Sequence, residues 1–235
     1  MMRLDKLIVE LGIGTRTEAK ALLKKGLIFV DGQKALKPEQ KVDENSAVIS
    51  YMGQEYTYKK FFYYIINKPA GVITATEDKH DETVMDVFYR QFPDARRDLA
   101  PVGRLDKDTT GLLLITNDGQ LAHEMLSPKK HVDKKYFVTL DGELTQEAIG
   151  ALESGVHIGE GENTAPATVE YAGGNTCYIT IHEGKFHQVK RMFYAVGRTV
   201  EALKRVEFGS LVLDETTLPP GCAMEITEVK NISPQ

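Results

Sequence analysis

Two short apolar runs, residues 61–66 and 112–116, constrain the fold of this chain more than any other feature. The first is aromatic and β-branched and stops at Asn-Lys-Pro-Ala-Gly, whereas the second is rich in Leu and Ile and stops at an Asp-Gly pair. Short apolar runs bounded by turn-forming residues are typical of buried strands. The sequence therefore predicts two buried strands, the second of which ends at an Asp-Gly turn.

Further patterns in the chain predict a mixed order of strands and helices. Strands are expected at residues 27–30, 47–50, 136–140, 167–171, 177–182 and 223–227, and helices at residues 83–91, 145–154 and 187–196. Residues 53–60, which are polar and rich in Tyr and Lys, are expected to be a linker. Because strands outnumber helices, we predict an α+β fold on a mostly antiparallel mixed sheet.

The first 26 residues indicate two short helices. Residues 3–11 carry Leu and Ile at helical spacing, and a second helix is expected to begin near Thr15 or Thr17, whose hydroxyls can cap it, and to stop at Gly26. Three basic residues are spaced four apart on this second helix and form a stripe: Arg16, Lys20 and Lys24.

The charge distribution permits nucleic-acid binding although the net charge of −5 argues against it at first. Residues 1–60 contain 11 Lys+Arg and 8 Asp+Glu, so the acidic excess lies in the remainder. Residues 184–205 contain six basic residues and one acidic residue. We therefore expect an acidic body with local basic patches.

Several classes of protein are not indicated. No run of about 18 apolar residues occurs, and no signal-peptide pattern opens the chain, so a cytoplasmic protein without a membrane partner is expected. Cys177 and Cys222 are far apart and no HExxH spacing occurs, so neither a disulfide nor a metal is expected.

The most informative stretch for chemistry is residues 103–119, where a polar loop with two carboxylates leads directly into an apolar strand. A loop held rigid at its exit is a suitable place for a reactive side chain. Asp106 and Asp108 are spaced i and i+2, and in a strand-like loop they would point to opposite faces. A glycosidase-type pair flanking one bond is therefore not expected.

The N-terminal segment resembles the S4 RNA-binding domain. The resemblance is carried by Arg3-Leu4-Asp5-Lys6, by Thr-Arg-Thr-Glu-Ala at 15–19 and by Lys-Gly-Leu-Ile-Phe-Val-Asp-Gly at 25–32. It implies an S4-like α/β domain at residues 1–58 whose basic residues bind RNA: Arg3, Arg16, Lys20 and Lys24.

The rest of the chain resembles the RsuA-like family of pseudouridine synthases. Three separated motifs carry the resemblance: Asn-Lys-Pro-Ala-Gly at 67–71, Gly-Arg-Leu-Asp followed by Asp-Thr-Thr-Gly-Leu-Leu at 103–113, and Glu-Gly-Lys-Phe-His-Gln-Val-Lys-Arg-Met at 183–192. The resemblance implies a catalytic domain at 59–235 that isomerises a uridine in ribosomal RNA without a cofactor.

The resemblance also assigns roles to individual residues. Asp106 is the expected catalytic carboxylate, Tyr136 the active-site tyrosine that stacks on the target base, and Lys190 the cation that pairs with Asp106, with Arg191 as the alternative partner. Since a stacked uridine must be flipped out of folded RNA, we expect Arg104 to fill the vacated space and hold a phosphate. Arg191 is a further candidate for RNA binding.

The expected substrate is 16S rRNA or a partly assembled small-subunit particle, and the protein is expected to act as a monomer. Large-subunit 23S rRNA is an alternative, because both groups of enzymes share the S4 module and the Gly-Arg-Leu-Asp loop. A non-catalytic rRNA-binding assembly factor and a nucleoside hydrolase are rival hypotheses. Neither rival would form a bond from C1′ to C5.

Overall fold

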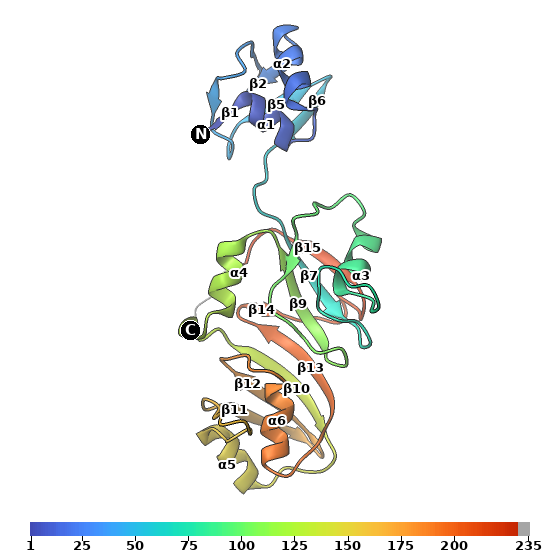
Figure 1. Ribbon diagram of the computed structural model, residues 1–235, viewed down its shortest axis with the longest axis vertical. Coiled ribbons are helices and arrows are strands. Elements are labelled where there is room, and N and C mark those ends of the chain that lie inside the picture. Colours follow the sequence, from blue (N-terminus) through green and yellow to red (C-terminus); the bar gives the residue numbers. More distant parts are fainter. Residues whose placement is uncertain (230–235) are drawn as a thin grey trace. The chain divides into compact units, whose positions relative to one another are not determined.

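A computed structural model describes residues 1–229 and divides the chain into two compact units, Met1–Lys60 and Phe61–Gln235. The first unit contains two helices and two small sheets (Figure 1). Its elements are β1 (Met2–Arg3), α1 (Leu4–Glu10), α2 (Arg16–Lys24), β2 (Ile28–Val30), β3 (Gln33–Lys34), β4 (Lys41–Val42), β5 (Val48–Tyr51) and β6 (Gln54–Thr57).

Thr15 begins the second helix of this unit. Its hydroxyl accepts from the Glu18 N–H while the Glu18 carboxylate accepts from the Thr15 N–H, so two helix-end donors are satisfied reciprocally. Apolar residues of α1 and α2 pack on β2 and β5 in one core that includes Leu4, Leu7 and Ile49. The two helices and the expected strands of this segment are confirmed.

The predicted linker at 53–60 was wrong in part. Strand β6 pairs antiparallel with β5, with Tyr56 opposite Ile49, so half of this segment belongs to the four-stranded sheet β3-β2-β5-β6. A reverse turn at Met52 and Gly53, both at positive φ, returns the chain onto β5. The polar side chains that suggested a linker are those of an edge strand with largely exposed residues.

The second unit is built on one mixed sheet with helices packed against it (Figure 1). Its elements through residue 140 are β7 (Tyr63–Lys68), α3 (Val84–Gln91), β8 (Ala100–Pro101), β9 (Thr110–Thr116), α4 (Gly119–Leu126), a 3-10 turn (Pro128–Lys130) and β10 (Lys134–Leu140). Those that follow are α5 (Gln146–Ser154), β11 (Thr168–Gly173), β12 (Thr176–Ile181), α6 (Gln188–Ala195), β13 (Val200–Phe208), β14 (Leu211–Val212) and β15 (Ala223–Ile226).

Strand order in this sheet is β11-β12-β10-β13-β9-β7-β15, with β14 beside β13 and β8 beside β9. Among the described residues the pairing is antiparallel except between β13 and β9, where Lys204 and Arg205 lie opposite Thr110 and Gly111. Two antiparallel halves therefore meet at a short parallel junction, and the predicted α+β fold on a mostly antiparallel mixed sheet is confirmed.

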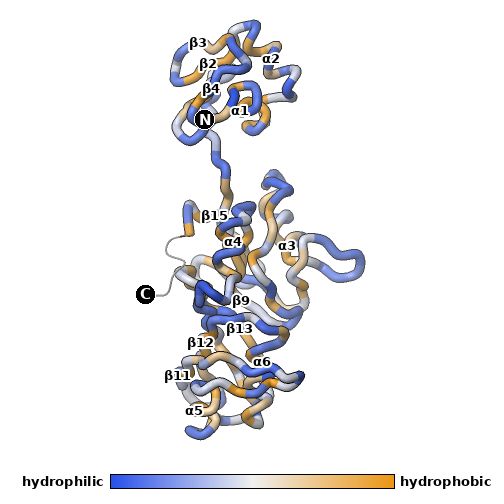
Figure 2. Tube along the Cα trace, turned by 60° about the vertical axis from the view of Figure 1, so that its left-hand side comes forward, coloured by the Kyte–Doolittle hydropathy of each residue, from blue (hydrophilic) through white to orange (hydrophobic). Residues whose placement is uncertain are grey.

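Strand β9 is buried on both faces, which explains its continuous apolar sequence. Leu113 and Ile115 belong to the core on one side, whereas Leu112 and Leu114 belong to the core on the other. Along β12, in contrast, apolar Cys177, Ile179 and Ile181 alternate with half-exposed residues, as expected for a strand with one covered face. Figure 2 shows hydrophobic and hydrophilic residues interleaved along the chain of both units.

Two longer elements of this unit, α4 and β13, were not anticipated, nor were the 3-10 turn and the two-residue strands β8 and β14. Asp118, expected in a turn, caps α4 by accepting from the Leu121 N–H at 3.1 Å. Strand β13, the longest in the sheet, passes through residues 200–208, which had been noted only for their basic charge. Charged side chains at four of its nine positions hide the alternation of this central strand.

Candidate active site

The loop that carries Asp106 is folded around a buried ammonium group. Lys68, at the end of β7, is fully buried, and its Nζ donates to the carbonyl oxygens of Asp106 at 3.0 Å and Thr109 at 2.8 Å. Burial lowers the pKa of Lys68 to about 8. Four backbone carbonyls surround this group, since those of Pro69 and Lys107 also accept from it, and they fix the path of the loop.

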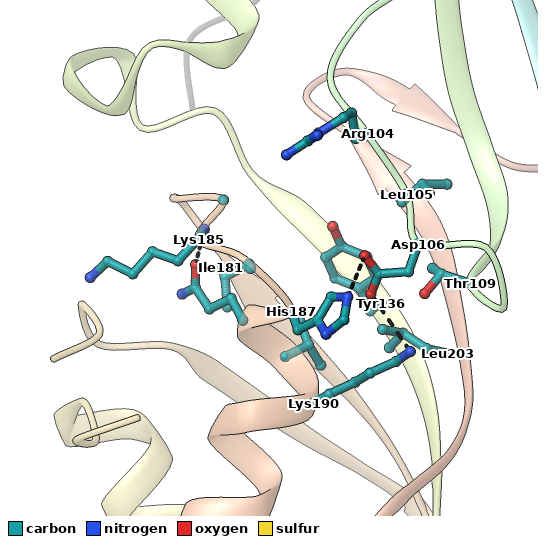
Figure 3. A pocket seen from close by; sticks show the side chains of 13 residues that line it. Arg104, Leu105, Asp106, Thr109, Tyr136, Ile181, Lys185, His187, Lys190 and Leu203 are labelled. Atoms are coloured by element: carbon teal, nitrogen blue, oxygen red, sulfur yellow. Dashed lines mark hydrogen bonds and ion pairs between the residues drawn. The ribbon is translucent and has the colours of Figure 1, made fainter. Parts of the chain in front are cut away.

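Asp106 lies between His187, which immediately precedes α6, and Lys190 of α6 (Figure 3). Its Oδ1 is 3.5 Å from His187 Nε2 and its Oδ2 is 3.6 Å from Lys190 Nζ. The carboxylate is 30% exposed, so it is accessible to a ligand. The expected pairing of Asp106 with Lys190 is thus present in the structure, whereas Arg191 does not come within ion-pair distance of it.

The expectation that Asp106 and Asp108 point to opposite faces was wrong. Lys190 Nζ donates to both oxygens of Asp108, at 2.6 and 2.7 Å, while it also approaches Asp106. The loop is a turn closed by the Thr109 N–H on the Asp106 carbonyl at 3.1 Å, so the alternation of an extended strand does not apply. The Lys190 ammonium lowers the pKa of Asp108.

Tyr136, on strand β10, lies beside Asp106 and appears behind the carboxylate in the view of Figure 3. Its cross-strand partner is Arg205 of β13, so both residues lie at the same level of the sheet. Arg205 is 2% exposed, donates from Nε to the Leu112 carbonyl at 2.8 Å, and lies 4.5 Å from the Phe208 ring. Tyr136, itself 8% exposed, is therefore fixed in the sheet beside a buried, hydrogen-bonded arginine.

These groups line an open cleft of about 760 Å³. Its walls come from the Asp106 loop, from β10 and from the segment that precedes α6, and they include Arg104, Asp106, Tyr136, Phe186 and His187. A smaller cavity against the same side chains also includes Lys190. The cleft can receive a planar group beside the carboxylate.

The two remaining arginines expected to bind RNA have different environments. Arg104 is exposed, lines the cleft and extends away from Asp106 (Figure 3). Arg191 is bound within the protein, because its guanidinium donates to the carbonyls of Ile158 and Phe186 and to the Glu162 carboxylate. Arg191 thus fastens α6 to the loop at 158–162.

In the first unit, the basic stripe lies on the solvent side of α2. Lys20 and Lys24 are exposed, and Arg16 keeps 65% of its side chain exposed while it approaches Asp5 at 3.7 Å. Arg3 binds the same buried Asp5 through two nitrogens, at 3.0 and 2.9 Å, and lowers its pKa. The four predicted RNA-binding residues of this unit therefore remain accessible.

Sequence reasoning missed two residues of the site. His187 and Lys68 both lie in the motifs that carry the family resemblance, but the sequence analysis assigned no role to either. The signal for Lys68 was a lysine at the end of an apolar strand, just before Pro-Ala-Gly. The signal for His187 was its place one residue before α6, where it adopts a left-handed backbone conformation.

Lys134, on the same face of β10 as Tyr136, yields a prediction about stability. Its Nζ is buried and donates to the Val132 carbonyl at 2.8 Å, without a carboxylate within 4.0 Å among residues 1–229. Burial, and secondarily Arg205, lower the pKa of Lys134 to about 8. Below pH 8 the Lys134 ammonium is charged in both the folded and the unfolded state, so the folded state bears the full cost of desolvating that charge. Between about pH 8 and 10.5 the unfolded state binds more protons, so stability rises with pH there.

We expect Lys134→Met to raise the free energy of unfolding at pH 7 by roughly 1–3 kcal/mol, because it removes an unpaired buried charge, and to flatten the rise above pH 8. Denaturant unfolding at pH 7 and at higher pH measures both effects. The matched control is Lys129→Met, which changes an exposed lysine. Equal pH dependence in the wild type and Lys134→Met would contradict the prediction.

Within residues 1–229, no three His, Cys, Asp or Glu side chains are grouped so that they could bind a metal ion. Over the same part of the chain, every helix is too short or too polar to cross a lipid bilayer.

The site places a carboxylate beside a tyrosine and a lysine in an open cleft, and the chain also contains a small unit with an exposed basic helix. Residues 62–195 match the family model of RNA pseudouridylate synthases, and residues 2–48 match that of the S4 domain. The chain therefore belongs to the RNA pseudouridylate synthase family and carries an S4 domain.

Relatives match over nearly the whole chain. An uncharacterized RNA pseudouridine synthase of Bacillus subtilis is 46% identical, over 97% of this chain and 95% of its own. The ribosomal small subunit pseudouridine synthase A of Vibrio cholerae is 40% identical (97% and 96%), and the ribosomal large subunit pseudouridine synthase B of Bacillus subtilis is 37% identical (99% and 96%). A crystal structure of a pseudouridylate synthase superposes with a TM-score of 0.65 at 34% identity, covering 97% of this chain and 96% of the other.

Proposed function

We propose that this protein converts a specific uridine of 16S rRNA into pseudouridine, with residues 59–235 as the catalytic domain and residues 1–58 as the RNA-binding domain. The observation that carries the proposal is the placement of Asp106 in an open cleft, beside Tyr136 and between His187 and Lys190. The 40% identity to a small-subunit enzyme favours 16S rRNA, and the 37% identity to a large-subunit enzyme makes 23S rRNA the second candidate.

The reaction is an isomerisation within one nucleotide. The bond from ribose C1′ to uracil N1 breaks, the base rotates, and a bond from C1′ to C5 forms while the proton of C5 leaves and N1 gains one. Atoms and electrons balance without a co-reactant. A carboxylate can serve this reaction by attacking C1′, by stabilising positive charge on the sugar or by removing a proton from it. In our proposal Asp106 is that carboxylate.

Lys190 and Tyr136 complete the proposed catalytic group. Lys190, held on α6, supplies a positive charge that faces Asp106 and anchors the loop through Asp108. Tyr136 offers a ring face for the target base and a hydroxyl that can exchange a proton with it. Because Tyr136 is fixed in the sheet opposite Arg205, the base can be held in one plane before and after its rotation.

RNA binding is assigned to basic residues of both units. Arg104 fills the space of the flipped uridine and holds a phosphate, and the stripe on α2 contacts the RNA backbone together with Arg3. Arg191 has its donors occupied within the protein, so any contact with RNA would add to its structural role. We further propose that the protein acts as a monomer in the cytoplasm, on naked rRNA or on a partly assembled small-subunit particle.

The test is to incubate the purified protein, without additives, with protein-depleted small-subunit particles and to map pseudouridine by carbodiimide modification and primer extension. A single new stop on 16S rRNA is expected. A stop on 23S rRNA alone would show that the substrate is 23S rRNA and not 16S rRNA. Release of free uracil would indicate a hydrolase, and binding without product would favour an assembly factor.

A further inference from the structure

Phe186 is a large apolar side chain that the proposed chemistry does not use. It is 68% exposed, and it lines the same cleft as Asp106 and Arg104. An isolated exposed aromatic residue is ordinary on a protein surface. One that projects at the edge of a cleft, beside a reactive carboxylate, offers a flat surface to whatever enters that cleft.

One face of the Phe186 ring is already covered. It stacks on His187 with ring centroids 3.8 Å apart and an angle of 18° between the planes. His187 in turn reaches Asp106 with Nε2. Asp106 therefore meets the edge of the imidazole while Phe186 covers one of its faces. The face of Phe186 that His187 does not cover remains for a ligand in the cleft.

The backbone that carries this stack is fixed before any ligand binds. The Phe186 carbonyl accepts from Arg191 Nη1 at 3.1 Å, and the Gln188 side chain bonds both the Lys185 N–H at 2.9 Å and the Glu183 carboxylate at 2.7 Å. Gln188 is 4% exposed, so the two bonds of its side chain are partly shielded from water. A pre-positioned ring binds a partner at a smaller cost in conformational entropy than a mobile one.

The cleft also provides a cation for the backbone of a nucleic acid. Arg104 makes no hydrogen bond or ion pair with any of residues 1–229, although it lines the cleft together with Phe186. An aromatic face for a base and a free guanidinium for a phosphate are the two elements that single-stranded RNA sites combine.

From this geometry we propose that the outer face of Phe186 is a stacking site for an unpaired nucleobase that neighbours the target uridine. The inference rests on the proposed function, because it takes RNA as the occupant of the cleft. With the target base beside Asp106 and Tyr136, a base on Phe186 is separated from His187 by the Phe186 ring and lies in the same cleft, where we place an adjacent nucleotide. Stacking tolerates any base, so the site contributes affinity and demands an unpaired neighbour.

The test is a cycle that pairs a protein variant with an RNA change. The probe is a short single-stranded RNA oligonucleotide with one uridine, either intact or with an abasic residue at one neighbouring position at a time. Affinity is measured by filter binding with all proteins in the Asp106→Asn background, so that catalysis does not enter. Phe186→Ala is expected to weaken binding of the intact RNA by roughly 5–150-fold, the range for one stacked base, and Phe186→Tyr to retain the affinity of its parent.

The decisive result is the loss of this effect on one abasic RNA. There Phe186→Ala and its parent should bind within about twofold of each other, because the base that stacks is missing. A purely structural role, such as supporting His187, would weaken binding to every RNA equally. The matched control is Tyr194→Ala, which removes a 78% exposed aromatic ring of the same segment and should leave affinity unchanged.

Equal losses on all RNAs, or an intact oligonucleotide that does not bind, would overturn the stacking site. The proposed function is followed separately, by pseudouridine formation with the unsubstituted protein on ribosomal RNA. If the protein shows the predicted coupling but makes no pseudouridine, the base-stacking site would be supported and the proposed reaction contradicted.

Discussion

Asp106→Asn is expected to reduce pseudouridine formation by roughly 10³-fold or more, the scale on which enzymes lose rate when a reacting acid, base or nucleophile is removed. Asparagine keeps the shape of the side chain and removes its negative charge. The neighbours at 3.5 and 3.6 Å, His187 and Lys190, contact different oxygens of Asp106, so in the variant one of them keeps an oxygen acceptor and the other faces the amide nitrogen. The loss therefore isolates the charge and nucleophilicity of the carboxylate, and single-turnover assays on the mapped rRNA substrate measure it.

Asp108→Asn is the matched control, because it makes the same change two residues along the chain in a carboxylate that also contacts Lys190. The Asp108 side chain is 73% exposed, and an exposed ion pair contributes little to stability. We expect activity within about tenfold of the wild type, since Lys190 keeps Asp106 as a partner. Similar losses for the two variants would show that the total charge near Lys190 matters, and would remove Asp106 from its proposed role.

Much of the fold could be predicted because local chemistry decides it. The helices after Thr83 and Thr145 begin where a hydroxyl can accept from the first turn, and the structure shows both caps. The buried strand β9 was visible as a continuous apolar run. Strand β13 was missed because its place between β10 and β9 is set by long-range pairing. Its charged residues Lys204 and Arg205 find their partners, Glu215 and the Leu112 carbonyl, only in the folded chain.

The sequence motifs predicted which residues form the candidate site, but they did not predict how these residues are arranged. Asp106, Tyr136 and Lys190 come from three distant segments, and the motifs gave no reason to expect Asp108 on the same ammonium. That contact depends on the turn that Lys68 stabilises from another strand. No local pattern signals a lysine whose partners are backbone carbonyls, because those acceptors exist at every position of the chain.

Gly111→Ala is expected to cost the protein about 3–5 kcal/mol of stability, the sum of a strained backbone and an overpacked core. Gly111 has φ +103°, a conformation that side chains disfavour, and it lies where the two halves of the sheet meet. A Cβ atom there would approach the Arg205 backbone nitrogen to 2.7 Å and its carbonyl oxygen more closely still. Neither atom is the end of a flexible side chain, so β9 and β13 would have to separate.

The junction that would open also supports the site, because Gly111 follows the Asp106 loop and lies opposite both Lys68 and Arg205. A loss of about 3–5 kcal/mol should lower the melting temperature by at least about 6 °C for a chain of this size. Gly150→Ala is the control: Gly150 lies in α5 with no atom within 4 Å of the added Cβ, so alanine should be neutral or stabilising by up to about 1 kcal/mol. Thermal and denaturant unfolding of the full chain compare the two variants. Equal melting temperatures for them would mean that the sheet tolerates a side chain at this contact, and that the close approach of β9 and β13 does not depend on glycine.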